Sequence, residues 1–353
     1  MSDAALRFGV WAQTEGTWHS LRHPADPFDA SFERNRRQVL EAEELGYETT
    51  LLAQHTVNPY GDGYDELEPW TAAAALAALT ERIELIVAIK PFLYHPVVLA
   101  KMALQIEEIS RGRLAINLVN AWYRPELEKA GITFAEHDER YGYGTEWLTV
   151  VRSLLSGKRT SFHGKYFDID DYVLRPSSHW RDRPRIYVGG ESGPAQDLAA
   201  GLADDWFLNG KPVQAVEQFA RQVGERPRTG PPLRLGLSAF VIARETEEEA
   251  DAELAYLAEL ATADKAEVSQ LYSNADSKAV MLQAAITTPH VGTNGGTAAG
   301  LVGSYDTVAD RVLRFHEAGV ETFMLQFQPF EAEMRRFAHE VIPRVRRLTR
   351  VAR

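Results

Sequence analysis

Apolar residues along the chain fall into short continuous runs that alternate with longer stretches in which apolar positions recur every three or four residues. The first pattern predicts buried strands and the second predicts amphipathic helices. Strands are expected at residues 6–12, 49–53, 83–89, 114–119, 185–188, 205–208, 233–243 and 322–326. Helices are expected at residues 32–45, 69–79, 96–109, 143–155, 194–202, 213–223, 245–260, 307–318 and 331–348.

Signals for helix ends support several of these boundaries. Gly46 follows the first helix as a C-cap glycine would, and Pro69 stands where a first helical turn accepts proline. Thr246 precedes a run of acidic residues, which favours the start of a helix.

Strands that alternate with helices indicate a parallel sheet, and eight such units in order indicate a closed barrel. We therefore predict an α/β protein with the (β/α)8 TIM-barrel fold, formed as a single domain by residues 1–353. Such a barrel needs about 250 residues. The remaining residues are expected in two insertions, around 161–184 and 262–304, and the second is a candidate lid.

Composition excludes several classes of chemistry. The 353 residues include no cysteine, so disulfides, thiolate metal sites and cysteine nucleophiles are excluded. Fifty acidic and 38 basic residues give a net charge of −12, which argues against nucleic acid or an anionic membrane as a partner. The ten histidines show no H-E-x-x-H pattern, so no metal site is expected. We find no long apolar span and no leader sequence, and therefore expect a cytoplasmic protein.

The active site of a (β/α)8 barrel lies where its strands end. The residues expected there are mostly aromatic or amide-bearing: Trp11, Gln54, His55, Lys90, Asn117, Asn120, Trp122, Phe240, Phe327 and Gln328. Aromatic side chains can pack on the faces of a flat ligand while amides bind its edges. Ordinary core packing is the alternative for each aromatic residue taken singly.

Two segments are candidates for binding a phosphate. Residues 189–193 (GGESG) join a strand to a helix, where glycine backbone, the helix N-terminus and Ser192 could bind an anion. A plain strand-to-helix turn is the alternative. Residues 136–141 (EHDERY) are either a solvated helix start capped by Asp138 or a segment that directs Arg140 and Tyr141 at a charged ligand.

Several segments in this order resemble the bacterial luciferase-like flavin monooxygenases. They are residues 109–126 (ISRGRLAINLVNAWYRPE), 136–141, 185–192, 203–210 (ADDWFLNG) and 235–250. Within that family the chain is similar to the two-component, reduced-FMN-dependent branch of dimethylsulfone, alkanesulfonate and pyrimidine monooxygenases. The resemblance is greatest to the dimethylsulfone type, through DWFLNG and the segment AFVIARETEEEA.

The resemblance implies bound FMN and assigns residues to it. The cofactor-binding residues would be Gln54, His55, Asn117, Glu126, Arg140, Tyr141, Gly190, Glu191 and Ser192. Asn117 and His55 would also be catalytic, His55 because imidazole exchanges protons near neutral pH. Trp11, Trp122, Phe240, Phe327 and Gln328 are expected to line the substrate pocket.

The resemblance also implies a reaction. FMNH2 delivered by a separate NAD(P)H-dependent flavin reductase would react with O2 to a flavin peroxide that oxygenates a small organic substrate. The resemblance also implies a homodimer or homotetramer, since relatives commonly form dimers or tetramers. Ser238, Phe240 and Gln328 stand where alkanesulfonate enzymes carry Arg, His and Tyr, so we expect a neutral substrate, including organosulfur compounds of the sulfone type. Asn120-Ala121 replaces the usual hydroxyl residue and glycine beside the flavin.

Three alternatives stay open at this point. The same superfamily includes deazaflavin-dependent oxidoreductases that transfer hydride and do not use oxygen. A barrel that stores or carries FMN without catalysis is the second alternative. An aldolase-type enzyme is the third, and it is disfavoured because Lys90, the one candidate Schiff-base lysine, has no evident acid partner.

Overall fold

A closed barrel of eight parallel strands is the centre of the structure. The computed structural model describes residues 6–276, 278 and 290–351. The strands follow the order β1-β12-β9-β8-β7-β4-β3-β2 around the barrel. Their bounds are β1 Arg7–Trp11, β2 Thr49–Leu52, β3 Glu84–Ile89, β4 Leu114–Leu118, β7 Arg185–Gly189, β8 Asp205–Leu208, β9 Arg234–Phe240 and β12 Val320–Gln326. The predicted (β/α)8 fold is confirmed.

The strands are apolar because both of their faces are covered. Every position of β3, sequence ELIVAI, is buried between the barrel interior and the surrounding helices. The same holds for β2, β4 and β8. Continuous apolar runs, without the alternation of a half-exposed strand, are what a parallel sheet covered on both faces requires.

Ion pairs close the end of the barrel at which the strands begin. Arg7 Nη2 lies 2.8 Å from Glu84 Oε2, and Arg234 Nη2 lies 2.7 Å from Asp205 Oδ2. Between them, burial and the charges of Glu84 and Asp205 raise the pKa of Tyr187 well above its ordinary value. This end therefore contributes to stability, and the cavity lies at the opposite end.

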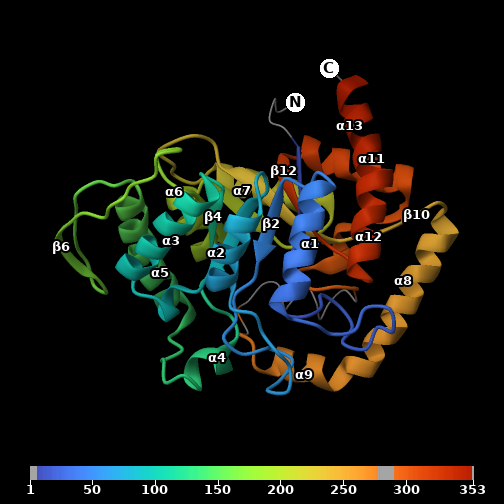
Figure 1. Cartoon of the computed structure of the whole chain (residues 1–353), viewed down its shortest axis with the longest axis horizontal. Helices are drawn as coiled ribbons and strands as arrows, with labels where there is room; N and C mark the ends of the chain where they lie inside the picture. Colours follow the sequence, from blue (N-terminus) through green and yellow to red (C-terminus); the bar gives the residue numbers. More distant parts are fainter. Residues whose placement is uncertain (1–5, 277, 279–289, 352–353) are drawn as a thin grey trace.

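Helices surround the barrel, and Figure 1 shows α13 at one end with α4 and α9 together at the other. The long helices are α1 Phe32–Glu44, α2 Pro69–Leu79, α3 Pro96–Ser110, α5 His137–Leu155, α6 Gly193–Leu202, α7 Val213–Gly224, α8 Glu247–Ala261, α11 Tyr305–Glu317 and α13 Ile342–Val351. Shorter ones are α4 Arg124–Glu128, α9 Lys265–Ser273 and α12 Phe330–Arg336, with a π-helical turn Phe337–Val341 before α13.

Most predicted helix ends agree with the structure within two residues, but the start of the helix predicted at 143–155 and the end of the one predicted at 331–348 do not. Pro69 begins α2, and Thr246 forms a capping box with Glu249 at the start of α8. Helix α5, however, begins at His137, six residues before the predicted start, and its N-cap is Glu136 where Asp138 was expected. Gly142 and Gly144 weaken the helical pattern there, but packing of α5 against α3 and α6 maintains the helix.

The two insertions add small elements outside the barrel. The first contains an antiparallel pair, β5 Thr160–His163 and β6 Asp168–Tyr172. The second contains α9, the 3₁₀ turns Thr262–Asp264 and Gly296–Ala299, and β11 Val302–Ser304. Strand β11 pairs with β10 Ile242–Arg244, so the single strand predicted at residues 233–243 is in fact two. The chain leaves the barrel after Phe240, and Ile242 N–H then donates to Leu301 O.

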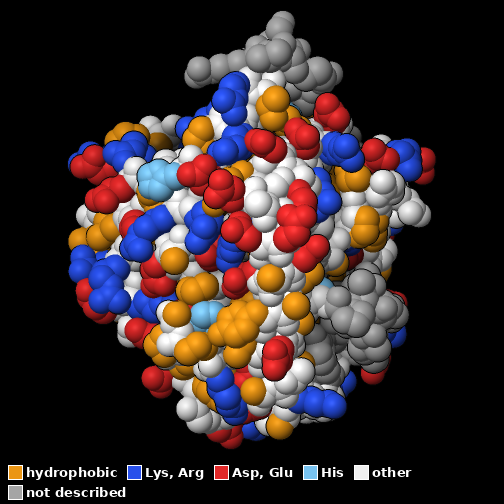
Figure 2. Space-filling view, turned by 90° about the vertical axis from the view of Figure 1, so that its right-hand side faces the viewer, with side chains coloured by type: hydrophobic (Ala, Val, Ile, Leu, Met, Phe, Trp, Pro, Cys, Tyr) orange, Lys and Arg blue, Asp and Glu red, His pale blue; other side chains and the backbone are white. Residues whose placement is uncertain are grey.

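Charged side chains of both signs occur together on one face of the molecule. Figure 2 shows acidic and basic side chains interspersed on the face that lies to the right in Figure 1. Within the described ranges, no helix has both the length and the apolar character needed to cross a membrane.

Candidate functional site

A cavity lies at the ends of the barrel strands, on the side where α4 and α9 meet (Figure 1). Strand-end residues that line it are Trp11, Leu51, Ile89, Asn117, Gly189 and Phe207. The second insertion supplies another part of the wall, through Leu271, Asp276, Lys278, His290, Thr293, Asn294 and Gly295. The expected position of the site therefore agrees with the structure.

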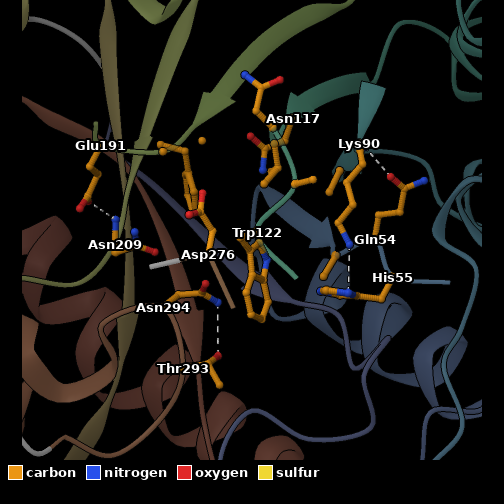
Figure 3. Close-up of a pocket in the computed structure, with 18 of the residues that line it drawn as sticks. Gln54, His55, Lys90, Asn117, Trp122, Glu191, Asn209, Asp276, Thr293 and Asn294 are labelled. Atoms are coloured by element: carbon orange, nitrogen blue, oxygen red, sulfur yellow. Dashed lines mark hydrogen bonds between the residues drawn. The ribbon is translucent and has the colours of Figure 1, made fainter. Parts of the chain in front are cut away.

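Most of the residues selected from the sequence meet at this cavity. Those that line it are Trp11, Gln54, His55, Lys90, Asn117, Asn120, Trp122, Arg140, Tyr141, Gly190, Glu191 and Ser192. Figure 3 shows Trp122 between the Lys90–His55 side of the cavity and Asp276. Glu126, Phe240, Phe327 and Gln328 are outside the lining.

The three predicted pocket residues that the structure places elsewhere have other packing roles. Phe240 belongs to a separate apolar cluster and is covered by Gly292, where a Cβ would lie 2.5 Å from its ring. Phe327 packs on the rings of Phe330 and Phe337 outside the barrel.

Gln328 is buried behind the loop that follows β1. Its Oε1 accepts from Ser20 N–H at 3.1 Å, and its Nε2 donates to Ser20 O at 2.8 Å. Gln328 therefore fixes this loop and is not available to a substrate.

Glu126 lies one layer behind the lining, in a buried charged group with Lys90 and His55. The Lys90 ammonium donates to Glu126 Oε2 and to His55 Nδ1, the latter at 2.9 Å (Figure 3). Thr56 N–H donates to the other carboxylate oxygen at 2.7 Å. Burial opposes the charge on Glu126, but Lys90 and His55 outweigh it and hold the pKa of Glu126 far below its ordinary value.

This group corrects the sequence-based view of Lys90. An acid partner was not evident in the sequence, and the structure supplies one in Glu126. A Schiff-base lysine must present a neutral amine. Lys90 Nζ instead donates to a buried carboxylate and contacts an imidazole nitrogen, so it is not presented to a substrate as an unengaged amine.

The glycine turn after β7 has the local geometry of an anion site. Ser192 is the N-cap of α6, and its Oγ accepts from Ala195 N–H at 3.4 Å. Gly190 has φ +110°, and a Cβ there would lie 2.8 Å from the hydroxyl oxygen of Tyr141. Only glycine therefore fits at this position. The Tyr141 hydroxyl also interacts with Ser192, and burial raises the pKa of Tyr141.

Glu191 and Arg140 are both engaged with other parts of the protein. Glu191 Oε1 accepts from Asn209 N–H at 2.9 Å and lies 2.5 Å from Lys211 Nζ (Figure 3). Arg140 is ion-paired with Asp276 and donates to Ala135 O at 2.7 Å. Arg140 therefore attaches the second insertion to α5, and any contact with a ligand phosphate would be additional to that ion pair.

Two amides in the cavity wall are buried without partners. Asn117 Oδ1 has no hydrogen-bond partner anywhere in the described ranges, and the same is true of both polar atoms of the Asn120 amide. Gly144 makes room for Asn120, because a Cβ on Gly144 would lie 2.1 Å from Asn120 Oδ1. Buried amide atoms without partners are costly, which indicates that a ligand supplies the missing bonds.

Comparisons with known proteins decide the family. Residues 6–322 match the family described as luciferase-like monooxygenase. The chain is 31% identical to the FMNH2-dependent dimethylsulfone monooxygenase of Pseudomonas putida, over 97% of this chain and 96% of the relative. It is 29% identical to the enzyme of the same description from Pseudomonas fluorescens strain Pf0-1, over 99% and 96%. The chain belongs to the luciferase-like monooxygenase family.

The fold of this luciferase-like monooxygenase agrees with that of solved relatives. A long-chain alkane monooxygenase superposes with a TM-score of 0.79 at 20% identity, over 99% of this chain and 92% of that one. The resemblance stated from the sequence is therefore confirmed at the level of family, fold and enzyme type. The roles predicted for single residues stay predictions.

Sequence reasoning missed two carboxyl groups near the cavity of this luciferase-like monooxygenase. Glu15 lines the cavity, with its Oε1 3.7 Å from His55 Nε2. Glu66 is mostly buried nearby, and Asn58 Nδ2 donates to its Oε2 at 3.2 Å. Burial raises the pKa of Glu15, and burial together with the charge of Glu15 raises the pKa of Glu66 to about 11. Glu15 follows β1 by four residues, so the strand-end rule could have found it, whereas no sequence signal points to Glu66.

Proposed function

We propose that this chain is the oxygenase of a two-component system that uses FMNH2 and O2 to oxygenate a small neutral organic compound. The two dimethylsulfone monooxygenases described above, similar over almost the full length, support this proposal and make sulfones the first substrates to test. The proposal includes a separate NAD(P)H-dependent flavin reductase and a homodimeric or homotetrameric enzyme.

The observation that carries the proposal is the order in which an anion-binding turn, apolar walls and unpartnered amides follow one another along the cavity. One end has the Gly190–Ser192 turn at the start of α6, which suits the phosphate of FMN. The walls between the ends are apolar at Trp11, Leu51 and Phe207 and suit a flat ring. The unpartnered amides of Asn117 and Asn120 could form hydrogen bonds with the polar edge of an isoalloxazine or with oxygen bound beside it.

When bound, reduced FMN would supply the electrons that activate oxygen; the residues of this chain bind, orient and exclude water. Ser192, Tyr141 and the α6 N-terminus would hold the phosphate. Asn117 would bind near the reacting oxygen, and Trp122, which lies between Asp276 and His55 in Figure 3, would exclude water. His55, fixed by Lys90, would exchange protons at its Nε2.

The charges around the cavity favour a neutral substrate. Among the described lysine and arginine side chains that line it, the buried Lys90 and Arg140 are each paired with a carboxylate, Glu126 and Asp276, and Lys278 is exposed to solvent. A buried sulfonate would need charged donors that are free to bind it. Ser238 stands where the resemblance implies a cationic side chain in alkanesulfonate enzymes. Its Oγ accepts a hydrogen bond from Trp11 Nε1 at 3.2 Å.

An anaerobic titration with FMNH2 followed by a stopped-flow pulse of O2 tests the proposal. Tight binding, rapid flavin oxidation and transfer of one labelled oxygen atom to a sulfone or related substrate are expected. Binding of a deazaflavin cofactor in place of FMNH2 would move the chain to hydride transfer. FMNH2 binding without oxygenation of any candidate substrate would favour a non-catalytic flavin carrier.

The phosphate assignment gives a separate prediction. Ser192→Ala should raise the Kd for FMN about fivefold, since one hydrogen bond contributes roughly 1 kcal/mol. The variant also loses the N-cap of α6, so its thermal stability is measured alongside the fluorescence titration of FMN. Ser192→Thr retains the hydroxyl and serves as the control. An unchanged Kd in Ser192→Ala would place the phosphate elsewhere.

A further inference from the structure

Glu15 occupies a distinctive position at the mouth of the barrel. It lines the cavity together with Trp18, His55 and Tyr60, and its side chain is only 11% exposed. Its backbone is fixed, because Asn58 Nδ2 donates to Glu15 O at 3.2 Å. A buried carboxyl group is thus held at the surface of the cavity, where it can meet reacting atoms.

The neighbouring imidazole is oriented toward this carboxyl. An ammonium can only donate hydrogen bonds, so Lys90 Nζ, 2.9 Å from His55 Nδ1, requires that this ring nitrogen accept. With Nδ1 as the acceptor, Nε2 is the ring nitrogen that donates. That atom faces Glu15 Oε1 across 3.7 Å, a separation that a small movement of either side chain closes to a hydrogen bond.

The charges around Glu15 favour its protonated form. Lys90 and Glu126 neutralise one another as an ion pair, with side chains 3% and 0% exposed. Neither Glu15 nor Glu66 forms an ion pair with a lysine or arginine in the part of the chain that the structure describes. An ionised carboxylate buried without such a partner is costly, and burial is the largest influence on Glu15 and raises its pKa.

We propose that Glu15 is a further catalytic residue of this pocket, a carboxylic acid that donates a proton to the reacting oxygen and is reprotonated through His55. The inference rests on the proposed function. In each turnover O2 gives one oxygen atom to the substrate and one to water, taking two electrons and two protons from FMNH2. Glu15 donates its proton to the oxygen that leaves as water. One of the protons released by the cofactor returns to its carboxylate through His55, so the protein is unchanged after the cycle.

The first test measures single-turnover oxygenation in wild-type and Glu15→Gln enzyme loaded with FMNH2. A general acid contributes roughly a hundredfold to ten-thousandfold, so a loss of that size is expected. Because the acid acts when protonated, the wild-type rate should fall as pH rises through the pKa of Glu15, and this fall should be absent from Glu15→Gln. The Kd for FMN should stay within about twofold, since no hydrogen bond to the cofactor is removed.

Two further variants control for misfolding and for general loss of a carboxyl group. Glu15→Asp keeps an acid at the site and should restore part of the rate and the fall at high pH. Glu66→Gln removes the neighbouring carboxyl, which does not line the cavity, and should keep the wild-type pH profile.

An infrared measurement on the cofactor-free enzyme tests the protonation state without any turnover. The difference spectrum between wild type and Glu15→Gln near neutral pH should contain the carbonyl band of a protonated carboxylic acid. Absence of that band, or a Glu15→Gln enzyme with the wild-type rate and pH profile, would overturn the inference and leave the proposed function intact. A wild-type enzyme that oxygenates nothing would overturn the proposed function itself, and that result is visible before any variant is compared.

Discussion

Replacing Lys90 with methionine should lower the free energy of unfolding by about 3–5 kcal/mol, because it leaves Glu126 charged and buried without its cation. Both side chains of this ion pair are almost completely inaccessible to water, so solvent screening reduces the effect very little. Methionine has a similar length and fills the space of the lysine stem. Urea unfolding monitored by tryptophan fluorescence measures the change.

The pH dependence of Lys90→Met separates charge from packing. In wild type the pKa of Glu126 lies below its unfolded value, so this group stabilises the fold above the unfolded pKa and the stabilisation is lost as pH falls through the folded pKa. Without Lys90 the burial of Glu126 raises its pKa. The deficit of the variant should then be smallest in acid and grow as pH rises above the unfolded pKa of Glu126, because the unfolded chain releases a proton that the folded variant retains.

The double variant Lys90→Met/Glu126→Gln is the matched control. It removes the uncompensated charge, and it should recover at least half of the stability lost in Lys90→Met. A deficit that is equal in both variants and independent of pH would mean that Lys90 contributes by packing alone.

Asn117→Ala should reduce single-turnover oxygenation about a hundredfold while the Kd for FMN changes less than about fivefold. The Asn117 amide faces the cavity from the end of β4, with its Oδ1 buried and unpartnered, whereas the phosphate is expected at the α6 end. Rapid-mixing kinetics and fluorescence titration measure the two quantities separately.

Asn117→Asp is the matched variant for this experiment. It keeps the shape of the side chain but removes the amide N–H donor, so it should be impaired like alanine if donation to reacting oxygen is what matters. Native turnover and native FMN affinity in Asn117→Ala would remove Asn117 from the mechanism.

The sequence was sufficient to predict the barrel and much of its cavity wall, for a physical reason. Parallel strands covered by helices must be apolar along their whole length, which makes runs such as residues 83–89 conspicuous. The carboxyl ends of parallel strands also meet on one side of the barrel. Residues as distant in sequence as Trp11, Asn117 and Ser192 could therefore be assigned to one cavity.

What could not be predicted depends on contacts between segments far apart in the chain. Phe240 ends a strand and so satisfies the rule, but Gly292 of the second insertion covers it. Lys90 and Glu126 are 36 residues apart, and nothing in either segment indicates that they pair. The predicted lid role of residues 262–304 lies partly outside the described residues, since 277 and 279–289 are not among them.

The second insertion also matters for how enzymes of this architecture can diverge. Asp276 and Asn294 belong to the cavity wall, yet they are attached by an ion pair to Arg140 and by a hydrogen bond from Gly210 N–H to Asn294 O. None of the eight barrel strands comes from this segment. Substitution of its cavity-facing side chains can reshape the chamber without changing any barrel strand. Related enzymes can thus acquire new substrates through substitutions in the second insertion. Selection meanwhile preserves the residues at the strand ends, which act on the cofactor that these enzymes share.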